Sequence, residues 1–320
     1  MTLTPEILAL LTLDVLFFSF GTIAFATSIT ILKYWDLDAS TALQYRLEKR
    51  AYLVGIIIKY IFVIKLPLFL FFIYTVDKLS AIITGAMCAT GVVNAVDFGF
   101  YLTILKVINL YGFGFWLLLY HYDKQQPISA YTKTLLWIFC FLFFFLVLEI
   151  GLEMAFFLKL DVSKIVSCCG TLFSSASTSY TSLLFHVDSR IWLMAFYGSA
   201  LLMLLATWLK KPMAMLFSNL LYLMFAIISL ILFFSTYVYE LPTHHCPFCL
   251  LQKEYYGVGY LLYTLLFLGT FYGIAGSFVM MVTHTNQSAW IKRSLGFNGL
   301  YMLLISLYPL VYYFKNGVWL

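Results

Sequence analysis

Residues 134–158 read TLLWIFCFLFFFLVLEIGLEMAFFL, an apolar run in which Glu149 and Glu153 are the only charged residues. A run of this length forms one helix across roughly 30 Å of membrane hydrocarbon. Over the whole chain 63% of the residues are apolar and only 10% are charged, a composition that excludes ordinary soluble domains. The sequence therefore predicts an all-α integral membrane protein.

Runs of this kind recur along the chain and predict a polytopic bundle of about eight transmembrane helices. The expected spans are residues 7–32, 52–76, 101–120, 134–158, 191–209, 213–237, 256–282 and 295–314. We expect a single membrane domain over residues 1–320, with no soluble domain. The first run lacks a basic flank and is too long for a signal-peptide core, so we expect it to be retained. Residues 82–96 are apolar and rich in small side chains, and either re-enter the membrane or extend the third span.

The distribution of lysine and arginine predicts the orientation. Ten basic residues fall in connections on one side and six on the other, and the pairs Lys49-Arg50, Lys210-Lys211 and Lys292-Arg293 lie on the richer side. Because basic residues are enriched in cytoplasmic loops, both termini are expected outside. The net charge of +5 is spread over loops as orientation signals are, and it does not indicate a nucleic-acid partner. The expected environment is the lipid bilayer of a bacterial or archaeal inner (plasma) membrane.

Five of the six cysteines fall on the predicted outer side. They are Cys88, Cys168, Cys169, Cys246 and Cys249. Thiols outside the cytoplasm meet oxidants, so they usually pair, bind metal or do redox work. Because five is odd, at least one of them stays free, binds a ligand or bonds to another protein. Cys140 lies inside a span and is expected to be a small buried apolar residue.

The Cys-Pro-Phe-Cys motif at residues 246–249 is the most specific signal in the chain. Pro242 ends the preceding helix, and we expect Cys246 at an N-cap-like position of the next span. The positive end of that helix dipole would lower the pKa of the thiol. His244 and His245 would shuttle protons or stabilise the thiolate. The alternatives are metal binding, a structural disulfide, or two free thiols.

Residues 246–249, followed by apolar residues and then charge up to Glu254, resemble the quinone-linked disulfide-forming membrane enzymes of the DsbB and vitamin K epoxide reductase type. A second outer cysteine pair is also similar to that family's pattern, with Cys168 and Cys169 as candidates. The resemblance implies a relay. An external thiol protein would be oxidised by the second pair, that pair by Cys246 and Cys249, and the electrons would pass to a quinone.

Ionisable residues inside spans are costly and are candidates for functional sites. Asp14, Lys65, Glu149 and Glu153 lie at similar predicted depths, and the two glutamates share a helix face because they are four residues apart. We expect Lys65 to pair with Glu149 or Glu153. The functional hypothesis is a buried site that carries protons between the outer face and a redox group. The alternative is a charge pair that locks helices together.

The leading hypothesis is a membrane thiol–disulfide or electron-transfer protein at the outer face, which exchanges electrons with a quinone. Whether it is an enzyme stays open, and its partners would be an extracytoplasmic thiol protein or other membrane subunits. One alternative is copper, zinc or iron handling or transport, since sulfur and imidazole ligands suit zinc and cuprous copper. Its ligands would come from Cys88, His244, His245, Cys246 and Cys249. Another alternative is a non-catalytic subunit or anchor with structural disulfides. Histidines at helix ends near both faces, among them His121 and His284, leave haem ligation open.

Overall fold

The computed structural model describes residues 4–36, 41–126, 131–162, 165–166, 185–283 and 288–320. Within these ranges its regular secondary structure is helical throughout, and eight helices are long and apolar enough to cross a membrane. Four of them are α1 (Pro5–Tyr34), α2 (Ala42–Leu79), α4 (Gly99–Lys124) and α5 (Thr132–Lys159). The others are α8 (Ser189–Leu209), α9 (Pro212–Ser229) with its continuation to Tyr239, α11 (Val258–Thr283) and α12 (Ser288–Asn316). The prediction of a polytopic all-α bundle is confirmed.

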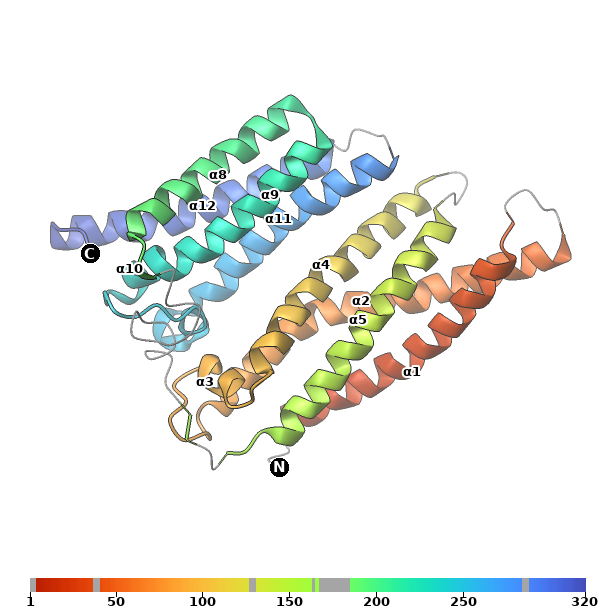
Figure 1. Ribbon diagram of the computed structural model, residues 1–320, viewed down its shortest axis with the longest axis horizontal. Coiled ribbons are helices and arrows are strands. Elements are labelled where there is room, and N and C mark those ends of the chain that lie inside the picture. Colours follow the sequence, from red (N-terminus) through yellow and green to blue (C-terminus); the bar gives the residue numbers. More distant parts are fainter. Residues whose placement is uncertain (1–3, 37–40, 127–130, 163–164, 167–184, 284–287) are drawn as a thin grey trace. The chain divides into compact units, whose positions relative to one another are not determined.

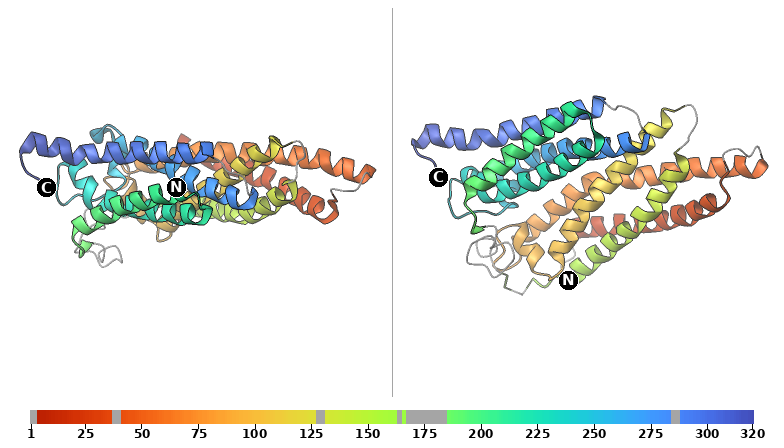
Figure 2. Two further views of the ribbon diagram at one scale, coloured as in Figure 1. Left: turned by 90° about the horizontal axis from the view of Figure 1, so that it is seen from above. Right: turned by 45° about the horizontal axis from the view of Figure 1, so that its top comes forward.

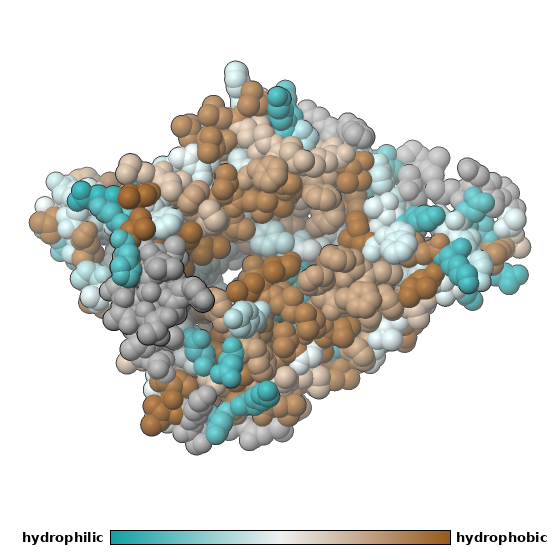
Figure 3. All heavy atoms as spheres, in the orientation of Figure 1, coloured by the Kyte–Doolittle hydropathy of each residue, from teal (hydrophilic) through white to brown (hydrophobic). Residues whose placement is uncertain are grey.

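Contacts divide the chain into two compact units. The N-terminal unit comprises residues 1–79 and 93–164, and the C-terminal unit comprises residues 80–92 and 165–320. Each unit therefore contains four of the long helices. Large apolar side chains such as Phe144 and Trp208 are exposed on the helices, as expected for surfaces that face lipid. Apolar residues dominate the sides of the helices in the view of Figure 3. The single membrane domain and the orientation stay predictions.

In the N-terminal unit, α1 packs against α2 and α5, and α4 packs against α5 and α2 (Figures 1 and 2). Aromatic rings fill the space between these helices. Phe62 stacks on Phe113 with ring centroids 4.3 Å apart, and its edge meets Trp116. The buried indole N–H of Trp116 donates to the Leu135 carbonyl over 2.9 Å, so the ring carries no unsatisfied polar group.

In the C-terminal unit, α11 packs against α12 and α9, and α8 packs against α9. Lys210 adopts a left-handed conformation (φ 53°) at the end of α8, Lys211 occupies the N-cap position of the next helix, and Pro212 begins α9. Helix α9 then continues through a π-helical turn, Leu230–Phe234, into α10 (Ser235–Tyr239). Such turns insert one residue into the helix and are frequent at functional sites.

Glycine at position 269 allows α11 and α12 to approach closely. A Cβ atom there would lie 2.0 Å from Asn298 Oδ1 and 2.8 Å from the Asn298 backbone nitrogen. We expect Gly269→Ala to destabilise the protein by about 1–3 kcal/mol, because backbone must move to relieve the overlap. Gly299→Ala in α12 is the matched control, since nothing lies within 4 Å of its added Cβ. Thermal unfolding in detergent checks both variants, and equal stability of the two would contradict the packing argument.

The boundaries of the predicted spans are broadly right, with two local corrections. Residues 82–96 form turns and the short helix α3 (Ala89–Asn94), and α4 begins separately at Gly99, so this segment does not extend the third span; its re-entry into the membrane stays a prediction. The span predicted to start at residue 256 starts at Val258. Tyr256 and Gly257 both have positive φ (56° and 60°), a conformation that an α-helix does not contain.

Candidate functional site

Three cysteines come together in the core of the C-terminal unit. The Sγ atoms of Cys88, Cys246 and Cys249 all lie within 4.8 Å of one another. Cys88 Sγ is 3.5 Å from Cys246 Sγ, well beyond the roughly 2.05 Å of a disulfide bond. The three residues are 0%, 1% and 3% exposed. We call them the cysteine cluster.

The cysteine cluster is held by hydrogen bonds from the helices and loops around it. The hydroxyl of Tyr239, at the end of α10, donates to the Cys246 carbonyl, and the hydroxyl of Tyr263 in α11 donates to the Pro247 carbonyl over 2.6 Å. The Gln252 amide donates to the Met87 carbonyl over 2.7 Å and so ties the segment that carries Cys88 to the loop of the motif. The positions of the three sulfurs are therefore determined by tertiary contacts.

The expected helix N-cap at Cys246 is wrong. Residues 249–251 and 253–255 form two short 3₁₀ turns, and α11 begins only at Val258. The left-handed residues 256 and 257 separate these turns from the helix. Cys246 therefore lies too far along the chain from the first turn of α11 for its dipole to act as predicted, since that effect falls off within one turn. The Thr90 hydroxyl lies beside this sulfur, with Oγ1 3.1 Å from Sγ.

Both histidines beside the motif are partly buried. The Nδ1 atom of His245 is 3.0 Å from the Ile231 carbonyl in the π-helical turn. Because a carbonyl only accepts, Nδ1 is the donor in this contact. The His244 ring lies edge-on to Tyr239, with centroids 4.4 Å apart, and its buried Nε2 has no hydrogen-bond partner among the described residues.

Burial shifts both imidazoles toward the neutral form. Burial lowers the pKa of His244; the Cys88 thiolate opposes that shift, and His245 adds to it. Burial also lowers the pKa of His245, against the hydrogen bond to Ile231. Neutral imidazoles accept a proton from a thiol, whereas they supply no fixed positive charge. The proton-shuttle and thiolate-stabilising roles expected for these histidines both stay predictions.

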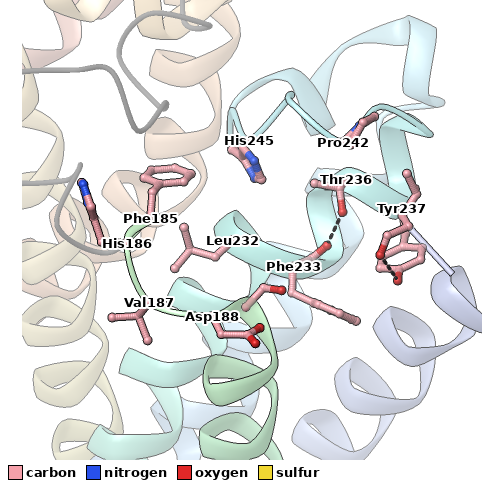
Figure 4. Close-up of a pocket in the computed structure, with 12 residues that line it drawn as sticks. Phe185, His186, Val187, Asp188, Leu232, Phe233, Thr236, Tyr237, Pro242 and His245 are labelled. Atoms are coloured by element: carbon pink, nitrogen blue, oxygen red, sulfur yellow. Dashed lines mark hydrogen bonds between the residues drawn. The ribbon is translucent and has the colours of Figure 1, made fainter.

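A pocket of about 510 Å³ lies beside His245 (Figure 4). Leu232 and Phe233 of the π-helical turn line it, together with Thr236 of α10 and Phe185. The rings of Phe185 and His245 meet edge to face with centroids 5.0 Å apart. Its size lies within the usual range for small-molecule sites, and its lining combines apolar rings with a few polar groups.

A second polar cluster lies in the core of the N-terminal unit. Lys65 Nζ is 2.7 Å from Asp14 Oδ1 and 3.1 Å from Glu149 Oε1. Lys106 Nζ is 3.0 Å from the same Glu149 oxygen and 2.5 Å from Glu153 Oε2. All five side chains are at most 4% exposed. We call these five residues the charge network.

The sequence predicts that Lys65 pairs with Glu149 or Glu153, and it pairs with Glu149; Asp14 also contacts Lys65, and Glu153 joins the network through Lys106. Sequence reasoning missed Lys106 and Asn109. Asn109 Nδ2 donates to Glu149 Oε2 over 2.6 Å. Both residues lie early in the predicted span 101–120 and are three positions apart, so they share one helix face. That spacing was the available signal.

The remaining candidates do not add to either cluster among the described residues. Cys168, Cys169 and His284 lie outside the described residues. Cys140 is buried within α5 of the N-terminal unit, as expected for a small apolar residue. It is not a member of the cysteine cluster. His121, near the end of α4, is exposed and contacts Gln125. Haem ligation stays an untested possibility.

No protein-family model, curated protein or solved structure matches this chain. Inferences about its chemistry therefore rest on the cysteine cluster and the charge network.

Proposed function

We propose that the protein is a membrane thiol redox protein in which Cys246 and Cys249 form the primary pair and Cys88 is the third thiol. The observation that carries the proposal is the 3.5 Å separation between Cys88 Sγ and Cys246 Sγ, beside a Cys-x-x-Cys motif. Thiol–disulfide exchange proceeds by attack of a thiolate sulfur on a disulfide sulfur. A third sulfur at this distance needs little movement to attack Cys246 in a Cys246–Cys249 disulfide.

The chemical step is a two-electron oxidation. The thiols of Cys246 and Cys249 lose two electrons and two protons, an S–S bond forms between them, and a quinone is reduced to the hydroquinone. A dithiol substrate then reduces that disulfide by two exchange steps and becomes a disulfide itself. Cys168 and Cys169 remain our proposed exchanging pair for the external thiol protein.

The surroundings of the cluster support proton removal from the thiols. The Thr90 hydroxyl, 3.1 Å from Cys246 Sγ, is placed to donate a hydrogen bond to a thiolate. The neutral His244 is near enough to Cys88 for the two to interact electrostatically, and its unpartnered Nε2 is a proton acceptor.

The pocket beside His245 is our proposed site for the quinone. Its volume of about 510 Å³ and its rings from Phe185 and Phe233 suit a planar aromatic head group. His245 directly precedes Cys246 in the chain. A quinone that contacts the His245 imidazole would therefore touch the residue next to the primary pair.

A soft metal ion is the second candidate for the same cluster, and one specific observation favours it. Three sulfurs bound to one zinc ion at about 2.3 Å stand roughly 3.8 Å apart, close to the Cys88–Cys246 separation. The described residues bring three sulfurs to within 4.8 Å of one another, which is the sulfur set of a Cys₃ site. Cuprous copper uses the same soft ligands.

One experiment tests both candidates. The purified protein is reduced, mixed with a water-soluble quinone without oxygen, and then alkylated and mapped by mass spectrometry, with metal content measured on the same sample. We expect hydroquinone and disulfide in equal amounts, with Cys246 in the new bond. Stoichiometric zinc or copper with protected thiols would replace the proposal by the metal site. Absence of both hydroquinone and metal would leave the cysteines a structural role and contradict both candidates.

A further inference from the structure

The charge network does not balance. Asp14, Glu149 and Glu153 supply three carboxylates, while Lys65 and Lys106 supply two ammonium groups. With every group ionised, one negative charge is left over in a core where no member is more than 4% exposed. A buried charge without compensation costs several kcal/mol, and proteins usually avoid it by a change of protonation.

Both lysines have reason to stay charged. Each ammonium contacts two carboxylates, and each also lies over an aromatic ring: Lys65 over Phe17 at 5.5 Å and Lys106 over Phe72 at 4.5 Å from the centroids. The ring faces add further attraction for a cation. Loss of a proton from either lysine would also enlarge the negative excess. The compensating proton therefore belongs on a carboxylate.

Glu149 is the carboxylate that best tolerates a full charge. Its Oε1 contacts both ammonium groups, and its Oε2 accepts from Asn109. Asp14 and Glu153 each use one oxygen for a lysine, while Asp14 Oδ2 and Glu153 Oε1 are buried and have no partner among the described residues. Glu153 also sits one helical turn from the ionised Glu149 on α5, where a second negative charge is repelled.

We propose that the charge network is a binding site for one proton, and that Glu153 carries it. The proton makes the network neutral, with two ammonium groups facing the carboxylates of Asp14 and Glu149. A group that binds and releases a proton within a membrane-spanning unit is the element from which proton relays are built. This inference is independent of the thiol chemistry proposed for the cysteine cluster.

A bound metal cation is a poorer match to the same charge. The cavity lined by Lys65, Lys106 and Glu149 has room for about 10 Å³, which is at most one water molecule. Hard cations take about six or more oxygen ligands. Here, among the described residues, Asp14 Oδ2 and Glu153 Oε1 are the carboxylate oxygens of the network without a donor, which is too few for such an ion, and the two ammonium groups repel it.

Infrared spectroscopy of the full-length protein counts protonated carboxyl groups through their C=O stretching band, which shifts in D₂O. Relative to the wild type near neutral pH, we expect Glu153→Gln to lose the band of one carboxyl group, because two carboxylates then face two ammonium groups. Glu149→Gln should lose one for the same reason. Lys65→Met should gain one. Asp123→Asn is the matched control: it removes a buried carboxyl group of α4 outside the network and leaves the network band in place.

The carrier is identified by conservative variants. Glu153→Asp should shift the position of the network band, whereas Asp14→Glu should leave it unchanged. The opposite result would assign the proton to Asp14 and overturn the role of Glu153. If Glu153→Gln removes no carboxyl band from the wild-type spectrum, the network binds no proton and the proposal is overturned. Suppression of the band by sodium or potassium, with choline as the control cation, would replace the proton by a metal cation. The glutamine variants keep the test valid if Lys65→Met does not fold.

Discussion

Replacement of Cys246 by serine is expected to lower quinone-linked thiol oxidation by on the order of 10³-fold or more, because Cys246 is the sulfur common to the primary pair and to the exchange step with Cys88. Cys249→Ser should have a smaller effect, since the primary disulfide is lost but the sulfurs of Cys88 and Cys246, 3.5 Å apart, can still pair. Cys88→Ser should be milder in single-turnover quinone reduction, because Cys88 enters only at the exchange step. Hydroquinone formation, followed by absorbance, measures all three variants.

Cys140→Ser is the matched control for these variants. It also removes a buried thiol, but from α5 in the N-terminal unit, outside the proposed chemistry. Its activity should stay at the wild-type level. Turnover that survives in Cys246→Ser, in protein that unfolds at the wild-type temperature, would exclude the cysteine cluster as the redox centre.

Replacement of Lys106 by methionine is expected to destabilise the N-terminal unit by about 3–5 kcal/mol, the usual cost of breaking a buried ion pair from one side. Lys106 lies 3.0 Å from a Glu149 oxygen and 2.5 Å from a Glu153 oxygen, so its loss leaves two buried carboxylates short of a partner. Methionine keeps most of the volume of the side chain and isolates the effect of the charge. Thermal or denaturant unfolding in detergent provides the measurement.

Two further variants make that result specific. Lys59→Met removes an exposed lysine of α2 and should change stability by less than about 0.5 kcal/mol. Adding Glu153→Gln to Lys106→Met restores the original excess of one carboxylate, so the double variant should recover much of the lost stability. Simple additivity of the two changes would show that the residues do not act as one network.

The sequence by itself determined the eight long helices and the class of the protein, because a membrane span depends on a local property. A run of sufficient apolar length, such as residues 134–158, must satisfy its backbone hydrogen bonds internally, whatever it packs against. The pair of Lys65 and Glu149 was predictable for a related reason, since two opposite charges at similar depth in the same hydrocarbon layer have few other partners.

Only the tertiary structure decided which residues meet within each unit. Cys88 and Cys246 are 158 positions apart, and their contact depends on the paths of two loops held by Gln252, Tyr239 and Tyr263. The entry of Lys106 into the charge network depends on the rotation of α4 about its axis, which packing against α5 and α2 determines. Span prediction uses apolar length alone and is insensitive to that rotation. The start of α11 at Val258 likewise follows from the positive φ angles of Tyr256 and Gly257. The pattern of apolar residues does not predict these backbone angles.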